Sequence, residues 1–484
     1  MIEDNASVAV IATLEAEVAA SAAGERLSSV RELMARHRAG PATVQRAIAD
    51  LAARGLVEAR PGRGTFVAAR SAPVVPDPSW QSVPLGARSV DADALVRLLR
   101  PPPADAFVLS SGYLPADLQP TALLGAALAR AARRPGAWDR VPLEGISGLR
   151  AYFAAEAGAT PGDVLITPGG QAALAACFRG LAAPGAAIVV ESPTYLGALV
   201  AARAQGLRPI PVPADAHGIR PDLLADALAS SGARVVYLQP VFANPHGVTL
   251  TPDRRAEVLA AVRAAGAFIV EDDAFRDIAL GPAPPPVGAT GEHARAAATR
   301  AAARARRAAV VVPPPLFADD QDGHVVRIRS LTKASAPGLQ IAAVIARGPA
   351  AARLRAARIV EDLFVTGPLQ EAALEVVGAP AWRAHLRKLR TVLAERRDAL
   401  VAALPMPVVA PEGGMNLWVP LPAGTDDVEL AQRAAAAGVV VSPGRAFFAA
   451  EPPGPFLRLT FAAEPPERLV EGVRLLSGAE VLGE

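Results

Sequence analysis

The stretch Ser330-Leu331-Thr332-Lys333-Ala334-Ser335-Ala336-Pro337-Gly338-Leu339 follows a short apolar run, Val325-Val326-Arg327-Ile328, and has the pattern of a strand that ends in a loop. The chain contains 47 arginines and only two lysines, so a position that needs only a positive charge is usually arginine. A desolvated lysine loses its proton and condenses with an aldehyde, which arginine cannot do. Two interpretations of Lys333 are therefore open. It is a surface lysine, or it is an amine that binds an aldehyde cofactor whose phosphate accepts hydrogen bonds from Ser330 and Thr332.

The second lysine, Lys388, lies in the basic segment Trp382-Arg383-Ala384-His385-Leu386-Arg387-Lys388-Leu389-Arg390. This segment has a helical pattern without hydroxyls or glycine. It predicts an exposed helix face.

Length and composition exclude several classes of protein. A chain of 484 residues suggests roughly three domains, and a net charge of +2 predicts no partner. The single cysteine, Cys177, lies in an apolar run and is expected to be a buried small hydrophobe, and the six histidines lack ligand spacing, so no metal site is expected. The acidic N-terminus and the lack of a membrane span predict a cytoplasmic protein without a membrane partner.

The first 70 residues have the pattern of three helices. Ser28 or Ser29 suits the cap of the second helix, and Pro41 suits the first position of the third. Apolar residues recur at helical spacing in the first and third helices: Ile11, Leu14 and Val18, then Val44, Ile48 and Leu51. The third helix therefore turns Thr43, Gln45 and Arg46 away from the core, as a helix that reads a DNA groove would.

Two short strands, residues 56–60 and 65–67, follow and are joined through Pro61-Gly62-Arg63-Gly64. From Arg26 to Arg70 there are nine arginines against three acidic residues, an excess that favours binding to DNA phosphates. With Leu27-Ser28-Ser29-Val30-Arg31-Glu32-Leu33, this region resembles the winged helix-turn-helix of the GntR regulators. The resemblance implies DNA contacts from six residues: Arg31, Thr43, Gln45, Arg46, Arg63 and Gly64. One departure is His37-Arg38-Ala39-Gly40, where the family has an apolar turn that ends in serine.

Residues 71–105 are rich in proline and predict a semi-rigid spacer with one short helix near Asp93–Leu99. Apolar runs of strand length then alternate with helical patterns: residues 187–190, 235–238, 268–270, 325–328 and 342–345. This alternation predicts an α/β domain with a mostly parallel sheet.

Polar residues gather where these strands end, which is where open α/β sheets bind ligands. Gly169-Gly170-Gln171 precedes a helix whose bare N–H groups could hold a phosphate. Tyr195 brings an aromatic ring, Asn244 an amide, and Asp272 a carboxylate that could keep a pyridine nitrogen protonated. Each feature alone is also ordinary turn or strand-end chemistry.

The order of these residues, with Lys333 and then Arg458, resembles the fold-type I aminotransferases over residues 107–484. The resemblance implies that Lys333 forms the Schiff base with pyridoxal 5'-phosphate. Asp272 would contact the ring nitrogen, Asn244 the ring hydroxyl and Tyr195 the ring face. The remaining implied contacts are to the cofactor phosphate, from Gly170, Gln171, Ser330 and Thr332, and to the substrate carboxylate, from Arg458.

Together the two halves resemble the MocR branch of the GntR family. This predicts a winged helix in residues 1–70, a linker in 71–105, and an aminotransferase-like region in 106–484 with a large domain to about 349 and a small domain from about 350. The resemblance implies a homodimeric regulator that binds double-stranded DNA and responds to an amine or amino acid. Its aminotransferase-like domain is expected to serve mainly for sensing, and residual transaminase activity stays open. The alternatives are a working aminotransferase with a DNA-binding arm, or a cofactor-free dimerisation domain.

Four departures from the family pattern weaken the catalytic interpretation. Gln340 stands where the family has a phosphate-binding arginine, and Ala274 where this branch has a tyrosine. Arg140 replaces a tyrosine that commonly reaches the neighbouring subunit's phosphate, and a positive charge there would compensate for Gln340. The segment from Gly281 to Pro315 is longer than the family pattern, and we expect an exposed inserted helix or a loop.

Overall fold

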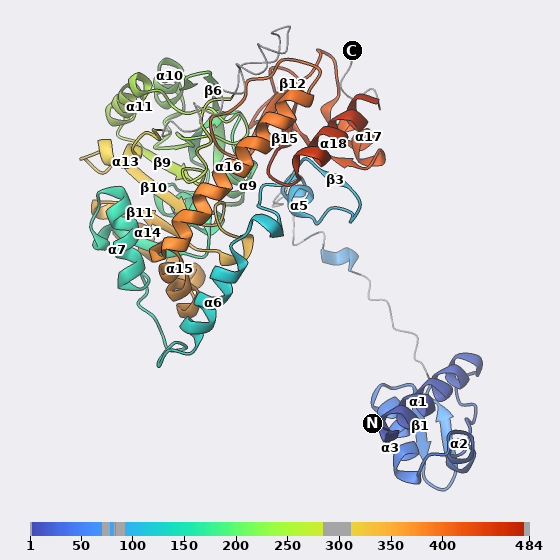
Figure 1. Cartoon of the computed structure of the whole chain (residues 1–484). Helices are drawn as coiled ribbons and strands as arrows, with labels where there is room; N and C mark the ends of the chain where they lie inside the picture. The colour runs from blue at the N-terminus through green and yellow to red at the C-terminus, as the bar shows by residue number, and fades with distance from the viewer. Residues whose placement is uncertain (1, 70–77, 82, 84–91, 284–310, 479–484) are drawn as a thin grey trace. The chain divides into compact units, whose positions relative to one another are not determined.

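The computed structural model describes residues 2–69, 78–81, 83, 92–283 and 311–478, with the side chains of residues 2–6 left out. It divides into two compact units, Met1–Ser89 and Val90–Glu484 (Figure 1). Most of the proline-rich spacer before residue 92, and residues 284–310 of the expected insertion, lie outside the described residues.

The first unit contains the predicted three helices and two strands. Their bounds are α1 (Ile2–Ala20), α2 (Val30–His37), α3 (Pro41–Ala53), β1 (Val57–Arg60) and β2 (Gly64–Val67). Ser29 caps α2: its hydroxyl accepts from the Glu32 backbone N–H at 3.3 Å, and the Glu32 carboxylate accepts from the Ser29 N–H at 2.7 Å. Pro41 is the first residue of α3, as expected, because its missing N–H costs nothing there.

The core of this unit lies under α3. Val44, Ile48 and Leu51 are buried, as their spacing predicted, and they belong to one cluster with Leu14 and Leu33. The strands β1 and β2 pair antiparallel and form the wing. Burial of one face of α3 leaves its opposite face to solvent.

The second unit is built on an eight-stranded sheet. The strands, in spatial order, are β4 (Val164–Thr167), β11 (Ala342–Ile345), β10 (Val325–Ser330), β9 (Phe268–Asp273), β8 (Val235–Leu238), β5 (Ala187–Ser192), β6 (Arg208–Asp215) and β7 (Gly218–Ile219). From β10 to β6 all neighbours are parallel, whereas β11 is antiparallel to both β10 and β4. The expected α/β fold with a mostly parallel sheet is confirmed, and so are all five predicted strands.

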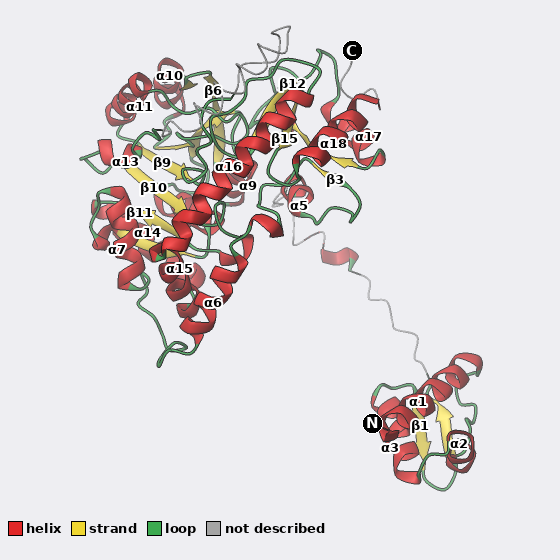
Figure 2. Ribbon diagram, viewed as in Figure 1, coloured by secondary structure: helices red, strands yellow, loops and turns green. Residues whose placement is uncertain are grey.

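Helices cover both faces of this sheet, and Figure 2 shows the strands enclosed by them. Alternate residues of β5 enter two different cores: Val189 packs in one, and Ile188 and Val190 pack in the other. The helices of this part of the unit are α6 (Thr121–Ala132), α7 (Ser147–Ala157), α8 (Gly170–Leu181), α9 (Leu196–Ala204), α10 (Pro221–Ser231), α11 (Pro252–Ala265), α13 (Leu316–Asp319), α14 (Gly348–Asp362), α15 (Gly367–Gly378) and α16 (Pro380–Ala403). Cys177 in α8 is fully buried, as expected.

The C-terminal part forms a smaller layer with segments from the start of the unit. Its elements are β12 (Asn416–Pro420), α17 (Asp427–Ala436), β13 (Val439–Val440), β14 (Ser442–Pro443), β15 (Phe456–Thr460) and α18 (Pro466–Gly478). The short strand β3 (Phe107–Val108) pairs with β13. The loop that follows β3 then reaches the eight-stranded sheet, where Gly112 accepts a hydrogen bond from Lys333. The expected short helix is present as α5 (Asp93–Leu99), and its Leu95 and Leu98 pack near Phe447.

None of the helices in the described ranges combines the length and the apolar character that crossing a bilayer requires.

Candidate functional site

The carboxyl ends of the parallel strands meet in one cavity, whose empty space of about 570 Å³ includes a part that is open to solvent. Parallel pairing places Asp272 of β9 directly opposite Ile328 of β10, and β10 then continues through Ser330 to Lys333. The structure brings all eight residues that the resemblance assigned to the cofactor into the lining of this cavity: Gly170, Gln171, Tyr195, Asn244, Asp272, Ser330, Thr332 and Lys333.

Lys333 has the environment that a reactive amine needs. Its Nζ donates a 2.9 Å hydrogen bond to the Gly112 carbonyl and lies 4.0 Å from the centre of the Tyr113 ring. Burial lowers the pKa of Lys333 to about 8, with a further contribution from the positive charge of Arg458. A useful fraction of this amine is therefore neutral, and nucleophilic, near neutral pH.

Asp272 is held rigidly at the end of β9. Its Oδ2 accepts from the Tyr237 hydroxyl at 2.8 Å and from Gln239 Nε2 at 2.9 Å. Both bonds end on Oδ2, which leaves Oδ1 for a donor in the cavity. Burial raises the pKa of Asp272 to about 6, so the carboxylate would be stabilised by a positively charged partner.

Small and hydroxylated residues line the opposite end of the cavity. Gly169 has φ +88° and precedes α8, whose first residue is Gly170. This φ is one that residues with a side chain rarely adopt, which favours glycine at position 169. The Thr332 Oγ1 is buried without a partner, and Ser330 is the last residue of β10. These groups could donate to a phosphate, together with the free N–H groups of the helix start.

Gln340 and Ala274 also line the cavity, where the family has a guanidinium and a hydroxyl. The amide of Gln340 donates to the Pro337 carbonyl at 2.7 Å. Phe275, next to Ala274, brings no hydroxyl either. Lys333 is the one cation among the described residues that line this cavity, so a phosphate would be held mainly by neutral donors.

Tyr195 and Gln171 are joined across the cavity wall. The Tyr195 hydroxyl donates to Oε1 of Gln171 at 3.4 Å, while Nε2 of Gln171 donates to the Gly197 carbonyl at 2.8 Å. A Cβ at Gly197 would lie 2.4 Å from the Tyr195 ring, so Gly197 makes room for the ring. This arrangement fixes an aromatic face at the start of α9.

Arg458 of β15 lies behind this cavity and does not line it. It is fully buried, its Nη1 donates to Oδ1 of Asn244 at 3.4 Å, and its guanidinium lies 5.0 Å from the centre of the Phe447 ring. Nε of Arg458 has no partner, and burial lowers its pKa to about 10. A desolvated guanidinium with an unused N–H favours a carboxylate ligand.

Sequence reasoning missed four residues of the site: Gly112, Tyr113, Tyr237 and Gln239. Tyr237 and Gln239 could have been found. Tyr237 lies near the end of the predicted strand 235–238 and Gln239 directly follows it, and this strand neighbours the one that carries Asp272. Gly112 and Tyr113 carried no such signal, since they reach Lys333 through the two-residue pairing of β3 with β13.

The residues present fit pyridoxal phosphate. An amine with a lowered pKa, a carboxylate with one open oxygen and a buried hydroxyl without a partner lie around one cavity. Within the described ranges, no three His, Cys, Asp or Glu side chains come together as a metal site requires.

The first unit presents a separate basic surface. Arg31, Gln45, Arg46 and Arg63 are exposed, and Thr43 and Gly64 are partly exposed. The Arg60 guanidinium lies 4.8 Å from the centre of the Phe66 ring and pairs with Glu58 at 2.9 Å. The outer face of α3 and the tip of the wing are therefore free to meet phosphates and base edges.

Comparison with known families agrees with this division. Residues 138–476 match the aminotransferase class I and II family, and residues 7–67 match the bacterial regulatory proteins of the gntR family.

Relatives extend over most of the chain. The 2-aminoadipate transaminase of Thermus thermophilus is 32% identical over 411 residues, which cover 83% of this chain and 97% of that protein. YdcR of Escherichia coli, named as an uncharacterized HTH-type transcriptional regulator, is 28% identical over 94% of each chain. The solved structure of LysN, the α-aminoadipate aminotransferase of Thermus thermophilus complexed with N-(5'-phosphopyridoxyl)-L-leucine, matches with a TM-score of 0.70 and 30% identity. It covers 81% of this chain and 95% of that one.

Proposed function

We propose that this chain, which belongs to the aminotransferase class I and II family and carries a gntR-type DNA-binding unit, is a transcription regulator. In this proposal it senses an amine through pyridoxal phosphate held at Lys333. The architecture is that of the MocR-type regulators, and relatives of similar length are named as HTH-type transcriptional regulators. The gntR-type unit implies binding to DNA, so we place the protein in the cytoplasm with the chromosome.

The observation that carries the sensing half is the single cavity shared by Lys333 and Asp272. When bound, pyridoxal phosphate supplies an aldehyde and a pyridine ring that draws electrons from an attached amine. In our proposal Lys333 holds the cofactor covalently, and Asp272 keeps the ring nitrogen protonated. Tyr195 would lie against the ring face, and Asn244 would meet the ring hydroxyl.

We assign the phosphate to Gly170, Gln171, Ser330 and Thr332. The orphaned hydroxyl of Thr332 supports this assignment, because a buried donor without a partner is costly unless a ligand uses it. An exposed Arg140 from a second copy would add the charge that Gln340 lacks.

We propose an amino acid as the effector. The unused Nε of the buried Arg458 supports a carboxylate next to Asn244, which lines the cavity and bonds Arg458, and the cavity beside Lys333 would hold the amine. We further propose a homodimer. Large apolar side chains that stay exposed on the second unit, among them Trp138 and Val360, support an interface with a second copy.

A working aminotransferase is the less favoured alternative. The similarity to a transaminase supports it, but Gln340 lacks the positive charge and Ala274 the hydroxyl that would hold the cofactor during repeated turnover.

The test is a band-shift titration with DNA from the vicinity of the coding sequence, with and without cofactor and amino acids. We expect wild-type protein to retard this DNA, and we expect an amino acid to change the retardation only when cofactor is present. The Lys333→Ala variant should bind DNA but not respond. A wild-type protein whose DNA binding ignores both cofactor and amino acids would refute the sensing role, whereas steady amino-group transfer without any effect on DNA would favour the enzyme.

A further inference from the structure

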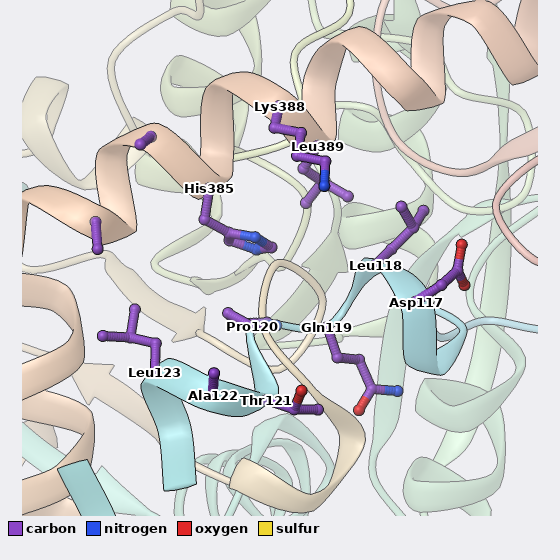
Figure 3. A pocket seen from close by; sticks show the side chains of 12 residues that line it. Asp117, Leu118, Gln119, Pro120, Thr121, Ala122, Leu123, His385, Lys388 and Leu389 are labelled. Carbon is purple, nitrogen blue, oxygen red and sulfur yellow. The ribbon is translucent and has the colours of Figure 1, made fainter. Parts of the chain in front are cut away.

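A second cavity lies between α16 and the segment that leads into α6, and Figure 3 shows its lining side chains. It encloses about 870 Å³, part of which is open to solvent. Residues of two segments line it: Asp117 to Leu123 on one side, and Ala381, Ala384, His385, Lys388 and Leu389 of α16 on the other. It shares no lining residue with the Lys333 cavity.

The charge balance of this second cavity favours an anion. Lys388, one of only two lysines in the chain, lines it and makes no ion pair among the described residues. The one carboxylate in the lining, Asp117, is already paired with Arg396 at 3.1 Å. The ammonium of Lys388 therefore remains uncompensated beside the cavity.

His385 adds a second polar group on the same side. Its Nε2 lies 2.8 Å from the Ala334 carbonyl, and because a carbonyl only accepts, Nε2 must carry the proton. Nδ1 is then an acceptor, and burial lowers the pKa of His385, so the neutral imidazole is favoured beside the ammonium of Lys388. The indole of Trp382 stacks on the ring at 5.3 Å and fixes its orientation.

Among the remaining lining residues, Gln119 and Thr121 carry polar side chains, and the Gln119 amide donates to the Leu114 carbonyl at 2.9 Å. The rest of the wall is aliphatic. Leu118, Leu123 and Leu389 line the cavity together with Ala381 and Ala384. This surface has no donors or acceptors on its side chains, so it suits a hydrocarbon stem more than a sugar or a nucleotide.

We propose that this cavity is a second ligand site, which binds a small aliphatic carboxylic acid through the ammonium of Lys388, next to His385. The carboxylate accepts hydrogen bonds from the ammonium of Lys388, and its stem packs beside the imidazole of His385 and against the three leucines. A ligand in this second cavity would influence the Lys333 cavity through His385. The imidazole of His385 donates to the carbonyl of Ala334, the residue that follows Lys333.

The probe is isovalerate, a branched carboxylate without an amine, which cannot react with the cofactor. Isothermal calorimetry on the full chain compares wild type with Lys388→Glu and with Arg387→Glu, a matched charge reversal on an exposed neighbour outside the lining. We expect Lys388→Glu to weaken binding about tenfold or more, and Arg387→Glu to leave it within about twofold.

Tryptophan fluorescence locates the site, because Trp382 contacts His385. We expect isovalerate to change the emission of wild-type protein but not of Trp382→Phe. Equal affinity in wild type and Lys388→Glu would mean that isovalerate occupies another site, such as that of Arg458, and would overturn the proposal. Absence of binding up to about 50 mM would also overturn it.

The effect on Lys333 rests on the proposed function. With cofactor attached, we expect isovalerate to shift the cofactor absorption of wild type and Arg387→Glu at the concentrations that saturate the calorimetric signal. Calorimetry needs no cofactor, so a protein that binds isovalerate at Lys388 but never binds cofactor would contradict the proposed function and leave the second site standing. A bound ligand that leaves the spectrum unchanged would refute the route through Ala334.

Discussion

The hydroxyl of Tyr237 donates a 2.8 Å hydrogen bond to Oδ2 of Asp272, from one strand of the sheet to the next. Gln239 adds a second bond to the same oxygen at 2.9 Å. The carboxylate is thus oriented before any ligand arrives, which lowers the cost of ordering it on binding.

Replacement of Asp272 by asparagine tests this orientation. The amide keeps the shape but not the charge, so it cannot stabilise a protonated ring nitrogen. We expect the cofactor dissociation constant to rise about tenfold to a hundredfold, in line with a lost hydrogen bond to a charged group. Absorbance titration measures it, with Tyr237→Phe as a control that keeps the charge and should lose much less. Unchanged affinity in Asp272→Asn would contradict the role given to Asp272.

The lowered pKa of Lys333 predicts how cofactor attachment depends on pH. An amine reacts when it is neutral, that is, above its pKa, so attachment should accelerate as the pH rises towards 8 and then level off. Nα-acetyl-lysine, with an ordinary amine, should keep accelerating to about pH 10 in the same assay. Stopped-flow absorbance follows both reactions. A protein that parallels the free amino acid would show that the burial of Lys333 has no effect on its reactivity.

Gln340→Arg should strengthen cofactor binding. A guanidinium at the edge of the cavity would add a charge-assisted bond to the phosphate, and we expect affinity to increase about tenfold. Gln340→Glu is the matched opposite and should weaken binding by repulsion. Both variants keep the same backbone strain at φ +44°. If arginine and glutamate give the same affinity, the phosphate does not lie near residue 340.

DNA binding should depend on the outer face of α3. Arg46→Ala removes an exposed guanidinium, so affinity should fall about tenfold, and the salt dependence should decrease by about one ion if the contact is to a phosphate. Arg54→Ala is the control, because Arg54 is tied to Glu15 and Asp50 within the unit. Fluorescence anisotropy at several salt concentrations measures both. Equal losses in the two variants would show that α3 has no special role.

The fold was predictable where each element carried its own pattern. The five central strands are short apolar runs. The start of α2 is indicated by the hydroxyl of Ser29 and the carboxylate of Glu32, which together form a capping box. The strand β6 gave no such signal, because it contains Pro209, Pro211 and Pro213. Because these prolines occupy alternate positions, the missing N–H groups all lie on one edge of the strand. The residues between the prolines keep their N–H groups, so β6 can still pair with β5.

The site was predictable only in part, for a similar reason. Residues at the ends of parallel strands meet at one edge, which brought Tyr195, Asp272 and Lys333 together as expected. Contacts made across the chain have no local pattern. Arg458 bonds Asn244, and Gly112 bonds Lys333, only because the C-terminal layer folds back on the start of the second unit.

The most direct test is borohydride reduction of the wild-type protein after incubation with pyridoxal phosphate, followed by peptide mapping. The account predicts a single phosphopyridoxyl adduct on Lys333, and loss of the cofactor absorption in Lys333→Ala but not in Lys388→Ala. An adduct on Lys388 with Lys333 unmodified, or no adduct at all with excess cofactor, would contradict it.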